Sequence, residues 1–203
     1  QELVETVYAL VDLLMEENEN IAAIGIASIG PVNVSEGVIV NPYYFNGIHD
    51  VHIKELIEER YGYPVFFDHD NQCAALAEYL YGNGRNYQDM ILVSISRGVG
   101  CGIIVQGHRI HSSYGYAPEI GHVSIDNKGP VCSCGNRGCL EMYVNSTHMQ
   151  NKLQAITGKK LPSAAEYMLM SDMPEVDRVM KECVNNLSAA LVSVINILNT
   201  QLI

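Results

Sequence analysis

Apolar residues recur at helical spacing in two long stretches of the chain. Residues 2–17 carry apolar side chains three and four positions apart, which predicts an amphipathic helix. Residues 174–198 repeat that spacing without a break and predict one long helix. Residues 51–60 predict a shorter helix, which Gly62 ends. The chain therefore supplies several helices that each need a partner surface.

Short apolar runs between these helices, bounded by glycine, proline or acidic residues, predict strands. These runs are residues 21–26, 37–40, 64–67, 90–95, 100–105 and 119–125. A hairpin turn is predicted at 106–108. The mixture indicates an α/β protein with mixed sheets and two lobes. Gly82-Asn83-Gly84 is the most linker-like spot, so we expect a partial N-terminal α/β lobe over 1–84 and a C-terminal α/β lobe over 85–203.

Composition narrows the class of protein. Of the 203 residues, 48% are hydrophobic, enough to bury a substantial core. The net charge of −11 argues against direct nucleic-acid binding by this segment, although a DNA-binding module outside it would be compatible. No apolar run is long enough to span a bilayer, and the first residues lack the basic start of a signal peptide. We therefore expect a cytoplasmic location, and we interpret the chain as a fragment of a longer protein because it begins at Gln1 and stops after the long helix.

Three of the six cysteines crowd into eight positions of one loop. Cys132, Cys134 and Cys139 are interleaved with glycines that let the backbone turn tightly. Without a secretory signal, crowded thiols favour a metal over disulfides. With one histidine they form a Cys₃His set, which suits a closed, structural zinc site. The alternative is three free thiols, and the pattern alone leaves His122, His108 and His111 open as the fourth ligand.

Acidic residues next to strand ends and next to the proposed metal ligands are candidates for binding. Asp70 follows a predicted strand and could bond a substrate hydroxyl or take its proton, or it could cap the helix that follows. Glu119 lies three residues before His122, and Glu141 lies two residues after Cys139. Several carboxylates around one pocket suit a polyhydroxylated ligand. The alternative is two solvated surface acids.

A glycine-rich turn joins two of the predicted strands. It contains Arg97, Gly98 and Gly100. Backbone amides of such a turn can cradle phosphate, although many hairpins carry glycine for turn geometry alone. This turn is a candidate contact for the phosphates of a nucleotide.

Four segments of the chain together resemble the ROK family (repressors, open reading frames and sugar kinases). Residues 25–32 resemble its glycine-proline sugar loop, and residues 68–78 its catalytic-aspartate segment. Residues 119–122 and 132–141 resemble its sugar and zinc signature.

The resemblance implies an actin-like (ribonuclease H-like) two-lobed ATPase-type fold, truncated at both ends, with a hexose bound between the lobes. It implies that the sugar is held by Asn46, His69, Asp70, Glu119, His122 and Glu141. It also implies that a structural Zn²⁺ is held by His122, Cys132, Cys134 and Cys139. In family kinases the residue matching Asp70 is the general base towards the sugar 6-hydroxyl.

Departures from the kinase pattern favour a regulator. The chain contains no Asp-x-Gly-Gly-Thr phosphate loop and stops before the adenosine segment. His69 and Gln72 stand where kinases usually have Asn, and Arg97 stands where they have Thr. We therefore expect the sugar-binding (effector) domain of a ROK-type transcriptional regulator. It would be a homodimer or tetramer that contacts DNA only through a module absent from this fragment.

Two alternatives stay open. The first is a kinase that uses ATP and Mg²⁺ to phosphorylate a hexose or N-acetylhexosamine at the 6-hydroxyl, with Gly98 and Gly100 at the nucleotide phosphates. The second is a zinc-stabilised domain without a ligand of its own.

Overall fold

The computed structural model describes residues 2–42, 45, 47–112, 116–170 and 172–203. The chain forms two compact units. Unit 1 comprises residues 1–73 and 111–117, and unit 2 comprises residues 74–110 and 118–203. The chain therefore passes between the units three times, after residues 73, 110 and 117. The domain boundary expected between residues 84 and 85 stays a prediction.

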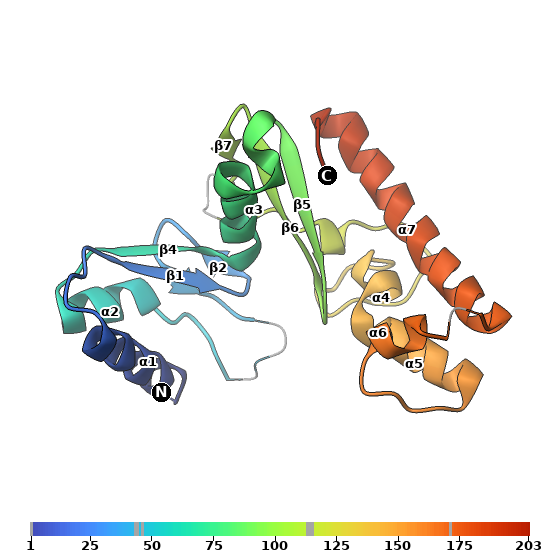
Figure 1. The fold of residues 1–203 in the computed structure, drawn as a ribbon, viewed down its shortest axis with the longest axis horizontal. Helices are drawn as coiled ribbons and strands as arrows, with labels where there is room; N and C mark the ends of the chain where they lie inside the picture. Colours follow the sequence, from blue (N-terminus) through green and yellow to red (C-terminus); the bar gives the residue numbers. More distant parts are fainter. Residues whose placement is uncertain (1, 43–44, 46, 113–115, 171) are drawn as a thin grey trace. The chain divides into compact units, whose positions relative to one another are not determined.

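Unit 1 is built around a pair of parallel strands (Figure 1). Its elements are α1 (Glu2–Glu17), β1 (Ile24–Ser28), β2 (Val32–Asn33), β3 (Val38–Ile39), α2 (Ile53–Tyr61) and β4 (Val65–His69). β1 pairs with β4 from Ile24↔Val65 to Ser28↔His69, and β2 pairs antiparallel with β3. The buried residues of α1, α2 and alternate positions of β4 form one core, whereas Phe66 on the other face of β4 is 71% exposed. The helices therefore cover one face of the β1–β4 pair.

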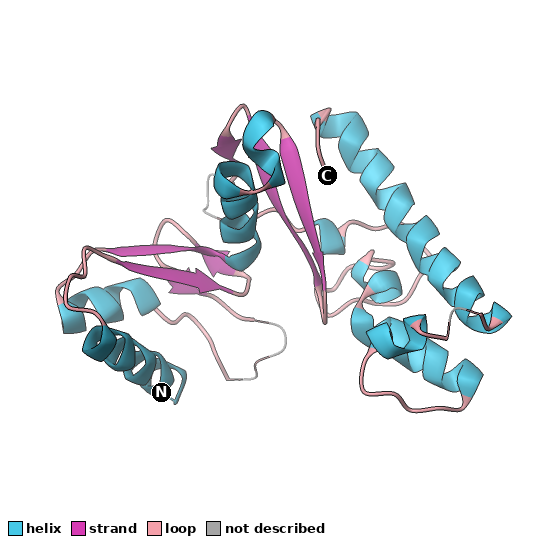
Figure 2. Cartoon of the chain, viewed as in Figure 1, coloured by secondary structure: helices cyan, strands magenta, loops and turns pink. Residues whose placement is uncertain are grey.

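Unit 2 contains a three-stranded antiparallel sheet and most of the helices. Helix α3 (Asp70–Tyr81) begins in unit 1 and continues into unit 2. The remaining elements are η1 (Asn83–Asn86), β5 (Met90–Ile95), β6 (Val99–Val105), β7 (His108–Arg109), η2 (Ile120–His122), α4 (Glu141–Val144), α5 (Ser146–Thr157), α6 (Ala164–Met168) and α7 (Pro174–Leu198). The sheet order is β5-β6-β7 (Figure 2).

The strands β5 and β6 separate two cores because side chains alternate between the faces of a strand. Met90 and Ile104 are opposite each other and pack with Ala75 of α3. Ile91 and Ile103, the next pair along, belong to the larger core that buries one side of α7. Unit 2 is thus a helix–sheet–helix sandwich, with α3 on one face of the sheet and α7 on the other (Figure 1).

The helices follow the sequence prediction closely, and one predicted strand is wrong. α1 and α7 have the predicted bounds of 2–17 and 174–198. Residues 119–125, predicted as a strand, instead contain the 3₁₀ helix η2. A side chain at Gly121 would put a Cβ atom 2.1 Å from the backbone oxygen of Val99. The glycine therefore permits a close backbone approach that an ordinary apolar strand would not make.

None of the helices in the described part of the chain is both long and apolar enough to cross a membrane.

Candidate metal centre and ligand-binding residues

One imidazole and three thiols converge in unit 2. The ligand atoms of His122, Cys132, Cys134 and Cys139 all lie within 4.8 Å of one another. The Sγ atoms of Cys134 and Cys139 are 3.7 Å apart, and Cys132 Sγ lies 3.6 Å from Nδ1 of His122. Cys132 and Cys139 are buried, whereas Cys134 is half-buried. The four residues that the sequence analysis predicted as metal ligands thus lie close together in the structure.

The cluster has the dimensions of a tetrahedral zinc site. Zn–S bonds of about 2.3 Å and a Zn–N bond of about 2.05 Å imply an S···S separation of about 3.8 Å and an S···N separation of about 3.6 Å. The observed 3.7 Å and 3.6 Å agree with both. A disulfide would hold two sulfurs about 2 Å apart. The four groups can therefore hold a metal ion, and a soft thiolate-rich set suits Zn²⁺ rather than Mg²⁺ or Ca²⁺.

The thiols interact strongly enough to hold their protons unequally. Burial acts to raise the pKa of Cys132, but hydrogen bonds from the Cys134 amide and the neighbouring side chains outweigh it and lower that pKa. Burial, together with hydrogen bonds to Cys134 and Cys132, raises the pKa of Cys139 to about 12. The pKa values of Cys132 and Cys139 thus shift in opposite directions, and three thiolates this close require a cation.

Tight turns bring the cysteines around one point. The Cys132 amide donates to the carbonyl of Asn136 (2.8 Å), and the Gly135 amide donates back to the carbonyl of Cys132 (3.0 Å). Gly138 has a φ of +64°, and a Cβ atom there would lie 1.7 Å from the carbonyl oxygen of Asp126. Only glycine satisfies both conditions, so this position in the loop is fixed by backbone geometry.

Backbone hydrogen bonds tie the cysteine loop to the segment that carries Glu119 and His122. The Leu140 amide donates to the Val123 carbonyl (2.9 Å), and the Ile125 amide donates to the Gly138 carbonyl (2.9 Å). Residues 123–125 and 138–140 therefore run side by side, with Ser124 opposite Cys139. The loop before Glu141 is thus attached to the segment after His122, while the convergence of the Glu119 and Glu141 carboxylates on one ligand stays a prediction.

Glu141 is buried and bonded to the glycine-rich turn. Its Oε2 accepts a hydrogen bond from the Val99 amide at 2.9 Å, and the residue is 7% exposed. A Cβ atom at Gly98 would lie only 2.9 Å from the same oxygen. The candidate phosphate turn thus already gives one of its amides to a carboxylate, while Gly100 lies within β6.

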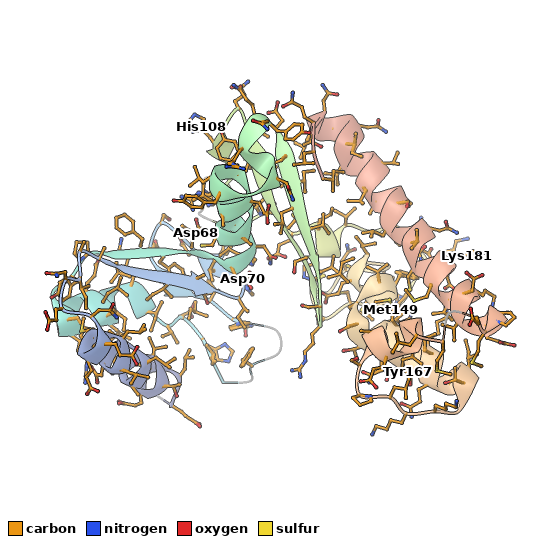
Figure 3. The ribbon with its side chains drawn as sticks, viewed as in Figure 1. Asp68, Asp70, His108, Met149, Tyr167 and Lys181 are labelled. Carbon is orange, nitrogen blue, oxygen red and sulfur yellow. The ribbon has the colours of Figure 1, made fainter. Side chains whose placement is uncertain are left out.

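The end of β4 in unit 1 carries the second group of predicted residues (Figure 3). His69 is 4% exposed, and its Nδ1 accepts a hydrogen bond from the Asn71 amide at 3.2 Å. Burial lowers the pKa of His69, against opposing charges on Asp70 and Asp68. In the neutral ring, acceptance at Nδ1 puts the proton on Nε2. Nδ1 also lies 3.2 Å from Oδ1 of Asp70.

Asp70 begins α3, and its side chain is 44% exposed. Its Oδ1 accepts hydrogen bonds from the backbone amide (2.6 Å) and side-chain amide (2.9 Å) of Asn71. The carboxylate thus lies at the helix N-terminus, where the helix dipole favours negative charge. Asn46, also predicted to bind sugar, lies outside the described residues.

Asp68 at the end of β4 was not selected as a site residue from the sequence, and His111 was considered only as a possible fourth metal ligand. Asp68 is 6% exposed, and its Oδ1 lies 3.3 Å from Nε2 of His111. The two residues are 43 positions apart, so no local spacing rule connects them. A charged residue inside an otherwise buried strand was the signal available for Asp68.

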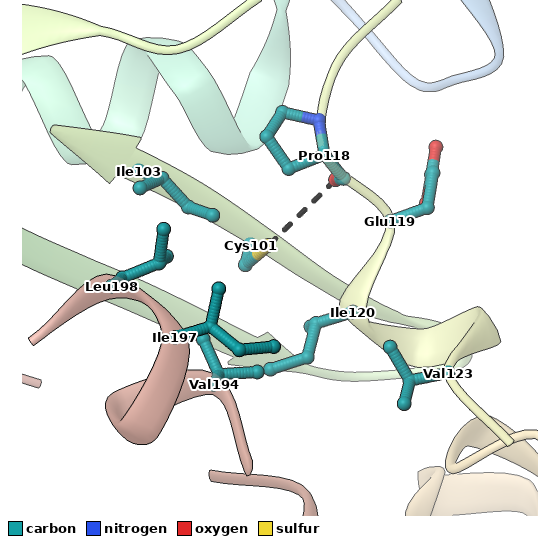
Figure 4. A pocket seen from close by; sticks show the side chains of 9 residues that line it. All are labelled: Cys101, Ile103, Pro118, Glu119, Ile120, Val123, Val194, Ile197 and Leu198. Carbon is teal, nitrogen blue, oxygen red and sulfur yellow. Dashed lines mark hydrogen bonds between the residues drawn. The ribbon is translucent and has the colours of Figure 1, made fainter. Parts of the chain in front are cut away.

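Unit 2 also contains an apolar pocket of about 230 Å³ (Figure 4). Its lining comes from β6, from the segment 118–123 and from the end of α7. Cys101 lies at its base, and its thiol donates to the Pro118 carbonyl at 3.7 Å. Burial raises the pKa of Cys101 to about 11. The Glu119 carboxylate points away from the aliphatic side chains of α7 in Figure 4, so the pocket itself is almost wholly apolar.

A family model described as "ROK family" matches residues 1–203, the whole chain. The chain belongs to the ROK family. As a ROK protein it has the actin-like α/β fold that the sequence resemblance implied, because solved structures of ROK kinases and regulators superpose on it. A ROK hexokinase from Thermus thermophilus superposes with a TM-score of 0.83 at 24% identity, covering 98% of this chain and 67% of that one. A ROK family transcriptional regulator, a homologue of E. coli Mlc, superposes with a TM-score of 0.81 at 26% identity, covering 98% and 53%.

The curated relatives of this ROK chain include both repressors and kinases. A xylose repressor of Bacillus subtilis (strain 168) is 32% identical over 152 residues, which are 75% of this chain and 39% of the relative. A glucokinase of Thermotoga maritima is 28% identical over 165 residues, which are 81% of this chain and 52% of the relative. The chain thus spans about half or less of the length of these relatives.

Proposed function

We propose that this ROK chain is the sugar-binding (effector) domain of a transcriptional regulator and that it carries a structural Zn²⁺. The observation that carries the proposal is the pairing of residues 123–125 with residues 138–140 beside the Cys₃His cluster. This pairing supports a pocket wall in which Glu119, His122 and Glu141 contact one ligand. A polyhydroxylated ligand suits such a wall, because every buried hydroxyl needs a hydrogen-bond partner.

Zinc would be held by His122, Cys132, Cys134 and Cys139, and it would fix the loop and the His122 tautomer when bound. Four protein ligands leave no open position, so the role is structural. Because Nδ1 of His122 faces Cys132, the nitrogen that we propose as the donor to a sugar hydroxyl is Nε2. When a metal binds one ring nitrogen of a histidine, the proton of the neutral ring must lie on the other nitrogen, which then acts as the hydrogen-bond donor.

The residues of unit 1 would complete the sugar site. Asp70 would accept hydrogen bonds from sugar hydroxyls, and a neutral His69 would offer its Nε2–H as a donor. Asn46 would add an amide. Binding of the sugar would shift the protein between two states with different DNA affinity, by as much as the sugar prefers one of them.

Three positions of the sequence favour a regulator over a kinase. His69, Gln72 and Arg97 stand where the kinase pattern has other residues, and Gln72 is fully buried, so its side chain belongs to the packing behind the site. DNA would be contacted by a module outside these residues, in a homodimer or tetramer, which is compatible with the net charge of −11.

A sugar kinase is the second candidate, and the half-exposed carboxylate of Asp70 favours it. This carboxylate could take the proton of a sugar 6-hydroxyl, while ATP and Mg²⁺ would be bound near Gly98 and Gly100 of the glycine turn. Against this, the Val99 amide of that turn already donates to Glu141. If the parent protein is a kinase, Asp70→Asn should abolish phosphorylation yet leave sugar binding largely intact. Unchanged turnover in that variant would remove Asp70 from the role of base.

Calorimetric titration of the zinc-loaded chain with D-xylose and D-glucose tests the sugar-binding proposal. We expect a saturable heat with one of them, and a loss of at least ten-fold in affinity for Glu119→Gln, because a buried hydroxyl loses its charged partner. The matched control is Glu175→Gln, which neutralises an exposed carboxylate at the start of α7. No heat with either sugar would favour a zinc-stabilised domain without a ligand. ATP turnover on the full-length parent separates the kinase from the regulator.

A further inference from the structure

Asp68 is a buried carboxylate that needs hydrogen-bond donors. It lies at the end of β4, one residue before His69, and its side chain is only 8% exposed. An ionised carboxylate is an acceptor only, and a buried one without donors is strongly disfavoured. The His69 backbone amide donates to Asp68 Oδ1 at 2.7 Å, and His111 Nε2 lies 3.3 Å from the same oxygen. The imidazole of His111 is therefore one of the groups that make this burial possible.

His111 belongs to unit 1, although the residues before and after its segment in the sequence belong to unit 2. Residues 111–117 belong to unit 1, whereas residues 74–110 and 118–203 on either side belong to unit 2. The hydrogen bond between His111 and Asp68 thus fastens this returning segment to the end of β4. The His111 side chain is 26% exposed, so the imidazole lies between the carboxylate and water.

The contacts form a short chain that leads to the predicted ligand-binding residues. His111 holds Asp68, and Asp68 accepts from the His69 amide. The His69 ring then accepts from the Asn71 amide, which also bonds Asp70. Each hydrogen bond in this chain orients the group that makes the next one. A rotation of a peptide group at the end of β4 would therefore move both the His69 ring and the Asp70 carboxylate.

We propose that His111 is a positioning residue that acts through Asp68 to hold His69 and Asp70 in their ligand-binding arrangement. The proposal assigns a role to a residue that no motif singles out as a ligand contact. It rests on the proposed function for its effect on sugar, but its effect on His69 is measurable without any sugar. Loss of His111 removes one of the donors to the Asp68 carboxylate, so we expect the carboxylate to turn towards water and to release the His69 peptide group.

Long-range ¹H–¹⁵N NMR of the histidine rings tests the first half of the proposal on the intact chain at pH 8. The wild-type His69 should show a non-protonated Nδ1 and a protonated Nε2. His111→Ala should average these two signals, because the His69 ring is then no longer held in place against the Asn71 amide. His111→Gln should restore the two separate signals, because its side-chain amide can donate to Asp68. The matched control is His52→Ala, which removes an exposed imidazole of the same unit that pairs only with the surface carboxylate of Glu55 in the described structure.

Titration with D-xylose and D-glucose tests the second half. We expect His111→Ala to raise the Kd of whichever sugar binds by about ten-fold, the cost of one lost hydrogen bond to a charged group. His111→Gln should bind within about two-fold of wild type, because one donor to Asp68 is retained.

The variants also separate the two proposals. If the wild type binds neither sugar, the proposed function fails, yet the His69 signals still decide the role of His111. If His111→Ala does not fold, Asp68→Asn takes its place and should average the His69 signals in the same way. Unchanged His69 signals in His111→Ala or its substitute would overturn the inference. So would His111→Gln behaving like His111→Ala, because the donated bond would then not be what matters.

Discussion

Replacing Gly138 by Ala should open the cysteine loop. The added Cβ would lie 1.7 Å from the Asp126 carbonyl oxygen, about half of a normal contact distance. Relief requires the backbone to move, which breaks the bonds from the Gly138 amide to Pro130 and from the Ile125 amide to the Gly138 carbonyl, both 2.9 Å. Each such bond contributes about 1 kcal/mol, and the φ of +64° costs an alanine about 1–2 kcal/mol more. We expect a total loss of about 3–4 kcal/mol in the free energy of unfolding.

The same loop supplies a control for this variant. Gly135 has a φ of +88°, but a Cβ atom there would meet nothing within 4 Å. Gly135→Ala should therefore cost only the backbone strain of about 1–2 kcal/mol.

Thermal unfolding of the zinc-loaded protein should put Gly138→Ala roughly 10 °C below wild type and Gly135→Ala only a few degrees below. Zinc content, measured by mass spectrometry of the metal, should fall chiefly in Gly138→Ala. Equal destabilisation of the two variants would show that the contact with Asp126 does not constrain the loop.

Cysteine and histidine chemistry gives three more predictions. Cys134→Ser should lose zinc and should lower thermal stability and sugar affinity together, because the proposed pocket wall is attached to the metal loop. Stability should fall as the pH drops below about 6.5. The pKa of His69 is lower in the folded protein, so the unfolded chain binds more protons there and acid favours it. Cys101, with a pKa of about 11 and 1% exposure, should react with iodoacetamide at pH 8 far more slowly than the half-buried Cys73.

Each of these has a decisive measurement. Metal analysis and calorimetry of Cys134→Ser would contradict the coupling if zinc is lost while sugar affinity stays at the wild-type value. Urea unfolding at pH 7.5 and pH 5.5 should show a smaller change in the free energy of unfolding for His69→Gln than for wild type. An equal change in both proteins would show that His69 does not cause the pH dependence. Peptide mass spectrometry over time ranks the two thiols, and equal rates would contradict the burial argument.

Much of the secondary structure could be predicted because it depends on neighbours in sequence. The apolar spacing of residues 2–17 and 174–198 gave α1 and α7 their bounds. Gly62 ends α2 in the left-handed conformation, as its position indicated. The failure at residues 119–125 has a non-local cause, because the strand prediction could not foresee that Gly121 packs against the backbone of Val99.

The candidate site divides in the same way between local and distant contacts. The spacing of Cys132, Cys134 and Cys139 with their glycines indicated a metal loop from sequence alone. Which histidine joins them was left open by that spacing, and the structure places Nδ1 of His122 3.6 Å from Cys132.

By itself the sequence determined the helices, the cysteine loop and the ROK resemblance, since these depend on periodicity and on residues a few positions apart. Only the tertiary structure decided that Glu141 bonds the Val99 amide 42 positions away and that Asp68 meets His111 43 positions away. The physical reason is that a buried carboxylate must find donors wherever the packed chain brings them, and spacing along the chain does not record where distant segments meet.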